Sequence, residues 1–173
     1  ARKTKYDMVS VYKKGLGWVN IDSQAPNQLV SQWLKNSPTI FKNITLFKPE
    51  YKLGKGRVDF YLECDTRKIL IEVKGCTLEI DGVGYFPDAP TERGIKHLYE
   101  LAKAAGEGYE CYIAFVIAMP NVKKVLPNVK NHPEFGVALK EAIKAGVNVI
   151  YFTCNVRPDE ISISNVIINK DIL

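Results

Sequence analysis

The sequence lacks the cysteine pattern of a disulfide-stabilised or zinc-binding protein. Its four cysteines are far apart and include no C-x-x-C pair, and only His97 and His132 could supplement their sulfurs in a metal site. A disulfide framework and a zinc site are therefore disfavoured, and buried reduced thiols of a cytosolic protein are expected instead. The cysteines are Cys64, Cys76, Cys111 and Cys154.

Long hydrophobic runs are also missing. The longest run, residues 111–119, has about nine residues, whereas a transmembrane helix needs about twenty. The first residues are basic and lead into no apolar stretch of the kind that a signal peptide requires. We therefore expect no membrane association and a cytoplasmic location.

Neither extreme charge nor low complexity marks the chain. Of 173 residues, 46% are hydrophobic and 25% are charged, which is ordinary for one globular domain with a buried core. Lysine and arginine number 24 against 19 acidic residues, giving a net charge of +5. This mild excess permits a polyanionic partner such as DNA but does not require one.

The spacing of apolar residues predicts strands first and then alternating helices and strands. The predicted strands cover residues 8–12 and 16–21, which form a hairpin, and residues 44–47, 58–62, 69–74, 111–118 and 147–153. The predicted helices cover the segment between a cap at Asp22 or Ser23 and Pro38, residues 91–105 and residues 133–145. Residues 48–57 are interpreted as a turn-rich basic stretch, and the end from Arg157 onward is ambiguous. The order predicts an α/β fold in which helices flank a mixed central β-sheet.

One predicted strand carries an acid and a base among apolar residues. Side chains two apart share a face of a strand, so Glu72 and Lys74 point one way while Ile71 and Val73 point into a core. Charged groups are seldom fully buried unless they are paired or hold a metal. Asp59 lies on the preceding predicted strand and approaches Glu72 if the two strands form a hairpin.

Two neighbouring carboxylates repel each other, and a divalent cation removes that penalty. Mg²⁺ or Mn²⁺ held by Asp59 and Glu72, with the Val73 carbonyl as a further ligand, can activate water for attack on a phosphodiester. Lys74 would orient the water or offset the developing charge. The alternative is an ordinary solvated Glu72–Lys74 ion pair, and on these residues alone that alternative is the stronger one.

The next segment carries a longer and more specific motif. Residues 75–78 read G-C-T-L, and residues 82–98 read G-V-G-Y-F-P-D-A-P-T-E-R-G-I-K-H-L. Together with the preceding E-V-K, they resemble the signature of the sugar fermentation stimulation protein A family, in which E-V-K precedes a T-L element, Y-F-P-D-A and T-E-R-G-x-K-H-L. Residues 50–54 and 57–60, and the N-Q-L of residues 27–29, are also similar to family motifs. The resemblance covers residues 3–156.

The resemblance implies a restriction-endonuclease-like PD-(D/E)xK core preceded by a small oligonucleotide-binding (OB) barrel. Residues 1–22 are then expected to be a hairpin that is a remnant of, or a link to, the OB-like domain, most of which is missing. Residues 23–173 are expected to form the PD-(D/E)xK nuclease-like domain. Two departures from the family pattern are G-C in place of S-V at residues 75–76 and Gln28 in place of an arginine, whose loss could weaken a phosphate contact.

The family also implies DNA binding without strong sequence preference. Two functions stay open, because a fold does not establish an activity. One is an Mg²⁺- or Mn²⁺-dependent deoxyribonuclease that uses Asp59, Glu72 and Lys74; the other is a non-catalytic DNA-binding regulator of sugar metabolism genes. A domain that binds no nucleic acid is a third possibility. A homodimer is common for this fold, but no residue specifies one.

Several other residues are predicted to bind DNA phosphates or to support the site. Arg93, Lys96 and His97 open the helix after the E-V-K strand, where backbone amides already favour anions. The alternative for Arg93 is an ion pair with Glu92 or Asp88.

A second basic group lies before Asp59. It comprises Lys52, Lys55 and Arg57, which are expected to contact DNA phosphates. The alternative interpretation is that they lie in a solvated turn. Glu50 is a candidate for a further metal ligand or for a water-positioning acid. Asn27, on the first helix, is a candidate donor to the site.

Overall fold

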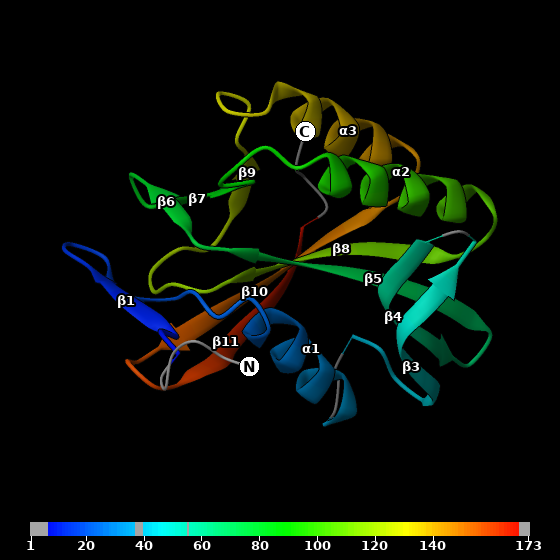
Figure 1. The fold of residues 1–173 in the computed structure, drawn as a ribbon. Helices are drawn as coiled ribbons and strands as arrows, with labels where there is room; N and C mark the ends of the chain where they lie inside the picture. The colour runs from blue at the N-terminus through cyan, green and yellow to red at the C-terminus, as the bar shows by residue number, and fades with distance from the viewer. Residues whose placement is uncertain (1–6, 37–39, 55, 170–173) are drawn as a thin grey trace, which may run out of the picture.

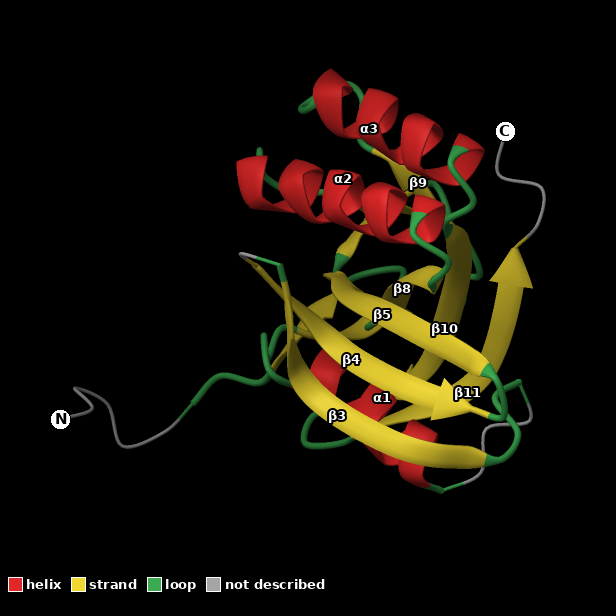
Figure 2. Ribbon diagram, turned by 90° about the vertical axis from the view of Figure 1, so that its right-hand side faces the viewer, coloured by secondary structure: helices red, strands yellow, loops and turns green. Residues whose placement is uncertain are grey.

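The computed structural model describes residues 7–36, 40–54 and 56–169. Its main sheet contains β3 (Ile44–Leu53), β4 (Gly56–Cys64), β5 (Arg67–Cys76), β8 (Glu110–Ile117), β10 (Asn148–Val156) and β11 (Ile161–Asn169). The helices are α1 (Ala25–Lys35), α2 (Glu92–Gly106) and α3 (Pro133–Lys144). The strand order is β11-β10-β8-β5-β4-β3. Helix α1 covers one face of the sheet, and α2 and α3 cover the other (Figures 1 and 2).

The predicted mixed α/β fold is confirmed. Strands β5, β8 and β10 are parallel, whereas β3, β4 and β5 follow one another antiparallel and β11 is antiparallel to β10. Strand β8 lies inside the sheet, as its continuous apolar sequence predicts, because a strand covered on both faces needs no polar side.

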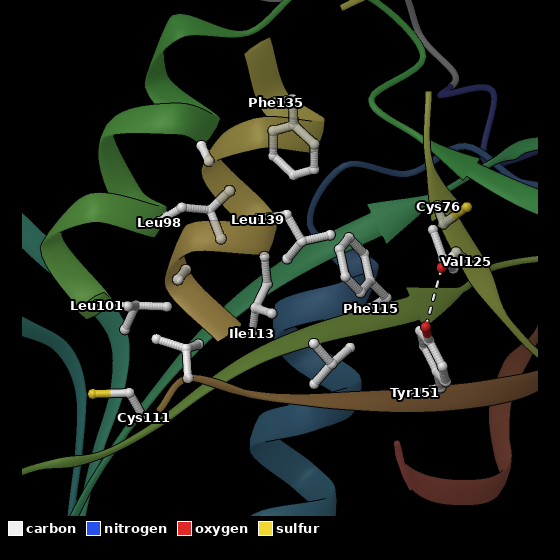
Figure 3. Close-up of a cluster of buried hydrophobic side chains, with 14 of the residues drawn as sticks. Cys76, Leu98, Leu101, Cys111, Ile113, Phe115, Val125, Phe135, Leu139 and Tyr151 are labelled. Carbon is white, nitrogen blue, oxygen red and sulfur yellow. Dashed lines mark hydrogen bonds between the residues drawn. The ribbon is translucent and has the colours of Figure 1, made fainter. Parts of the chain in front are cut away.

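Side chains of β8 alternate between two cores. Ile113 and Phe115 face α2 and α3, while Ala114 and Val116 face α1. Figure 3 shows the first of these cores, in which Leu98 of α2 packs with residues of α3 and β8. Both cores extend across β5, so this strand is held firmly from two sides.

Helix α2 begins where the sequence predicts. Thr91 is its N-cap, and the hydroxyl of Thr91 accepts a hydrogen bond from the Gly94 backbone amide at 3.0 Å. Helix α1 differs from the expectation. Its N-cap is Gln24, whose side chain forms no capping bond, and Asp22 instead accepts from the Gln24 backbone amide at 2.9 Å. Pro38, the expected stop of α1, lies outside the described residues.

The interpretation of residues 48–57 as a turn-rich stretch is wrong for most of that segment. Strand β3 runs on through Leu53, and Pro49 is paired opposite Phe60. Proline lacks a backbone donor and is therefore tolerated in edge strands, and β3 is an edge of the main sheet. The C-terminal segment that was ambiguous in sequence is β11 at the opposite edge.

A small second sheet was not predicted. It consists of β6 (Leu78–Ile80), β7 (Val83–Phe86) and β9 (Val125–Pro127). Asp81 and Gly82 form its hairpin turn with φ angles of 50° and 78°. An Asp-Gly pair between short apolar runs is a hairpin signal, so this element was readable in the sequence.

The predicted N-terminal hairpin is present as β1 (Ser10–Lys13) and β2 (Gly17–Asn20). It is tied to the end of β8 by the Asn20 backbone amide, which donates to the Ala118 carbonyl at 2.9 Å. None of the helices formed by the described residues is long and apolar enough to cross a membrane.

Candidate active site where two strands separate

The candidate site lies where β4 and β5 stop pairing. The antiparallel ladder runs from Cys64 opposite Arg67 to Phe60 opposite Ile71, and the next residues on the two strands are Asp59 and Glu72. The hairpin that was needed to bring these two carboxylates together is therefore present. Each strand continues past this point, so the strands separate and leave the two acids at the opening.

Asp59 is held by two donors. The Val73 backbone amide donates to Asp59 Oδ2 at 2.7 Å, and Asn27 Nδ2 of α1 donates to Asp59 Oδ1 at 3.0 Å. Burial and the nearby charge of Glu72 raise the pKa of Asp59, and the two hydrogen bonds and the charge of Lys74 only partly oppose this rise. The positive charge and hydrogen-bond donors near Asp59 are therefore too weak to keep its pKa at the ordinary value.

Glu72 is almost completely buried, with 3% of its surface exposed. Lys74 Nζ donates to Glu72 Oε1 at 2.7 Å, and His97 Nδ1 contacts the same oxygen. Burial acts to raise the pKa of Glu72, but the hydrogen bonds and charges of His97 and Lys74 outweigh it and hold this pKa below its usual value. Glu72 is therefore ionised at neutral pH.

A chain of contacts leads from Glu72 to the surface. Lys74 Nζ lies 3.3 Å from His97 Nδ1, and Arg93 Nε lies 3.3 Å from His97 Nε2. In the described part of the chain, Arg93 forms no ion pair with Glu92 or Asp88. At the start of α2, His97 is the residue that contacts Glu72, and Arg93 contacts His97.

Asp59 and His97 line a cleft of about 830 Å³ between β3, β4 and the start of α2. Its exposed cations come from both sides and are Lys52, Arg57, Arg93 and Lys96. Lys55, predicted to belong to this group, lies outside the described residues. Three acidic residues, Glu50, Asp59 and Glu92, also line the cleft. The four cations along its rim can still bind a phosphodiester backbone.

Glu50 lies in β3 between the residues that pair with Phe60 and Val58, and is therefore across from Asp59. Its φ of 50° is unusual for a residue other than glycine and marks a local distortion of the strand. Its exposed carboxylate lies 3.7 Å from Arg57. Glu50 is thus close to the site, but its carboxylate makes an exposed ion pair there.

The site offers hard oxygen donors to a cation. Across the described ranges, no group of three or more histidine, cysteine, aspartate or glutamate side chains has the geometry of a metal site. The charge of Glu72 nevertheless raises the pKa of Asp59, so the two carboxylates are close enough to interact. Mg²⁺ is commonly held by one or two carboxylates with waters in its remaining positions, so these residues fit such an ion.

Sequence reasoning missed two features of the site. The direct contact of His97 with Glu72 depends on how α2 docks on the sheet, which no local pattern reports. Ser31 and Gln32 of α1 were not singled out, and Gln28 was noted only as a replacement of a family arginine, although all three line a second pocket beside Asp59. Their spacing on one helical face was the available signal.

Known proteins match nearly the whole chain. The family profile described as "Sugar fermentation stimulation protein RE domain" matches residues 24–160. The chain belongs to the sugar fermentation stimulation protein family. Family homologs from Desulfitobacterium hafniense strain Y51 and Clostridium beijerinckii are each 48% identical to it, over 160 and 162 residues. These alignments cover 92% and 94% of this chain, and 69% and 71% of the respective relatives.

A solved structure of the same family has a similar fold. It is Pyrococcus furiosus SfsA in complex with Ca²⁺, with a TM-score of 0.81 and 28% sequence identity. The match covers 96% of this chain and 73% of the other. The family and fold inferred from the motif around residues 72–98 are both confirmed.

Proposed function

We propose that this chain binds DNA and hydrolyses its phosphodiester bonds with Mg²⁺ or Mn²⁺ at a site formed by Asp59, Glu72 and Lys74. The observation that carries the proposal is the meeting of two carboxylates and a lysine beside a cleft with four exposed cations. Asp59 and His97 line this cleft, and Glu72 and Lys74 contact His97 from the buried side. The Ca²⁺ bound by the Pyrococcus furiosus relative supports a divalent cation in this family.

Asp59 and Glu72 would hold the cation, with the Val73 carbonyl as a further ligand. The bound ion supplies a Lewis acid that generates hydroxide from water and offsets charge on the phosphoryl oxygens. Asn27 fixes the orientation of Asp59 through its 3.0 Å hydrogen bond. Lys74 places a positive charge where the attacking oxygen or the pentacoordinate phosphorus centre develops negative charge.

The rim of the cleft would position the substrate. Lys52 and Arg57 from one side and Arg93 and Lys96 from the other can bind successive phosphates. Such contacts carry no base identity, so binding without strong sequence preference is expected from them. Arg93 also touches His97, which links the phosphate-binding rim to Glu72.

A second candidate function is a DNA-binding regulator of sugar metabolism genes that does not cleave DNA. It is favoured by one observation: Glu72 already has Lys74 and His97 as partners. A buried carboxylate that is fully paired gains less from a cation than an unpaired one. Under this function the basic cleft would be used for binding alone.

The two functions are separated by a cleavage assay on linear duplex and single-stranded DNA in EDTA, Mg²⁺ or Mn²⁺. Asp59→Ala and Glu72→Ala are compared with the wild type and with Asp159→Ala, a matched change of an exposed acid. The proposal expects metal-dependent cleavage by the wild type and the Asp159 variant only. Salt-sensitive DNA binding without cleavage in any metal would contradict it and leave the regulator.

A further inference from the structure

A second pocket lies on the other side of Asp59 from the basic cleft. It has a volume of about 320 Å³ and is formed by α1, β3 and β4. Gln28, Ser31 and Gln32 of α1 face Pro49 and Phe60 across it. Asp59 and Glu50 line both this pocket and the cleft, so a ligand bound at Asp59 has access to both spaces.

The two spaces differ in charge. The cleft has four lysine or arginine side chains on its rim, whereas none lines the pocket. Phosphates are therefore drawn to the cleft. Besides the carboxylates of Glu50 and Asp59, the pocket offers carboxamides, a hydroxyl and the apolar surface of Pro49 and Phe60. This lining disfavours a phosphate and suits an uncharged group with hydrogen-bonding edges and apolar faces.

The polar lining is not required by the fold of α1. Leu29, Val30 and Leu34 supply the buried face of the helix and pack in the core. Gln28 and Gln32 are exposed, and with Ser31 they lie at i, i+4 and i+3 on one face. Glutamine side chains both donate and accept hydrogen bonds, and they pair with the edges of nucleobases, notably that of adenine.

We propose that this pocket receives the base of an unpaired nucleotide next to the phosphate bound at Asp59. The inference rests on the proposed function and adds a substrate class to it: single-stranded DNA. The base leaves its stack, enters between Gln28 and Gln32, and contacts the apolar wall. The pocket is near the lower end of the size range for small-ligand pockets, which suits one base and excludes a duplex.

The test uses a 12-nucleotide strand with one internal 2-aminopurine, alone and as a duplex, in Ca²⁺, the ion in the structure of the Pyrococcus furiosus relative. Gel electrophoresis of the same samples checks that the strand stays intact. Anisotropy gives the Kd for each form, and 2-aminopurine fluorescence reports whether the base has left its stack. The variants are Gln28→Ala/Gln32→Ala and Ser31→Tyr, which fills the pocket. Gln24→Ala is the matched control, because Gln24 is an exposed glutamine at the N-cap of α1 that does not line the pocket.

The wild type and Gln24→Ala should bind the single strand more tightly than the duplex and change the 2-aminopurine signal. Both pocket variants should weaken single-strand binding about tenfold, which is the scale of one lost base contact, and leave duplex binding unchanged. If the wild type binds DNA but the pocket variants retain its preference and signal, the pocket inference fails and the proposed function stands. If the wild type binds neither the single strand nor the duplex, the proposed function fails and the inference fails with it.

Discussion

Asp59 and Glu72 are adjacent carboxylates whose pKa values move in opposite directions. Burial and the charge of Glu72 raise the pKa of Asp59, while His97 and Lys74 overcome burial and lower the pKa of Glu72. The difference follows from where the positive charge lies, because Lys74 and His97 both contact Glu72. In the absence of a cation, Asp59 is therefore the acid with excess negative charge around it.

Asp59→Asn should stabilise the metal-free protein at neutral pH. Because the pKa of Asp59 is raised in the folded state, the wild-type protein loses stability as the pH rises from the ordinary pKa of 3.8 through the folded pKa. The variant lacks this loss, so its advantage should be present above the folded pKa and should disappear below the ordinary value. Urea unfolding in EDTA across pH measures it, with Asp159→Asn as the control. A variant less stable than the wild type at every pH would contradict this account.

Glu72→Gln should have the opposite effect. Because the folded pKa of Glu72 is lowered, its carboxylate contributes stability above the ordinary value of 4.5, and that stability is lost as pH falls through the folded pKa. At neutral pH the variant also leaves Lys74 without its partner, so a loss of about 3 kcal/mol is expected. The same unfolding series checks it: the loss should shrink in acid, and a loss independent of pH would argue against an ionised Glu72.

At the residue scale, the proximity of the three central residues could be predicted because strand alternation and an antiparallel hairpin are local rules, although those rules alone favoured an ordinary Glu72–Lys74 ion pair over a site. Asp59, Glu72 and Lys74 needed only the correct pairing of β4 with β5. The partners of Glu72 were less accessible. His97 is 25 residues away in sequence from Glu72, and its contact depends on the docking of α2.

At the scale of elements, α2 carries Arg93, Lys96 and His97 to the cleft, so the start of this helix matters more than its length. Thr91→Ala removes the acceptor for the Gly94 amide and should destabilise the protein by about 1 kcal/mol. The first turn of α2 should also become looser, which should weaken DNA binding. Chemical unfolding and DNA anisotropy measure the two effects.

Thr66→Ala is the matched control for that change, because Thr66 is exposed in the turn between β4 and β5. It should alter neither quantity. Equal stability of the two variants would show that the Thr91 cap contributes little.

Elements were predictable where one signal dominated. The apolar run of β8 and the capped, periodic sequence of α2 each left little choice. Strand β3 was cut short because residues 48–57 were interpreted as a turn-rich basic stretch, although Pro49 within them is acceptable at a sheet edge. Whether a strand is at an edge is decided by the whole sheet, and a local pattern does not contain that information.

At the scale of the whole molecule, the net charge of +5 is small, and the arrangement of cations matters more than their number. Lys52→Ala and Lys96→Ala should each weaken DNA binding whatever the DNA sequence. Each should also reduce, by about 1, the slope of the logarithm of the binding constant against the logarithm of the salt concentration. Lys144→Ala, an exposed lysine at the end of α3, should leave the slope nearly unchanged. Equal slopes for all three variants would place the DNA elsewhere.

The overall topology combines local and non-local information. The mixed sheet could be inferred from the order of strands and helices, but the position of α1 against β4, which brings Asn27 to Asp59, could not. That arrangement creates the opening with a cleft that carries lysine and arginine side chains on one side and a pocket without them on the other. The site is therefore a property of the assembled fold as much as of its motif.

The most direct test of the central claim is Mn²⁺ binding, followed by electron paramagnetic resonance of the free ion. We predict one Mn²⁺ site per chain in the wild type and in Asp159→Asn, with the site lost in Asp59→Asn and Glu72→Gln. Binding should strengthen as pH rises through the raised pKa of Asp59, because the cation competes with a proton there. Equal Mn²⁺ binding by all four proteins, or none by the wild type, would contradict a metal site between β4 and β5.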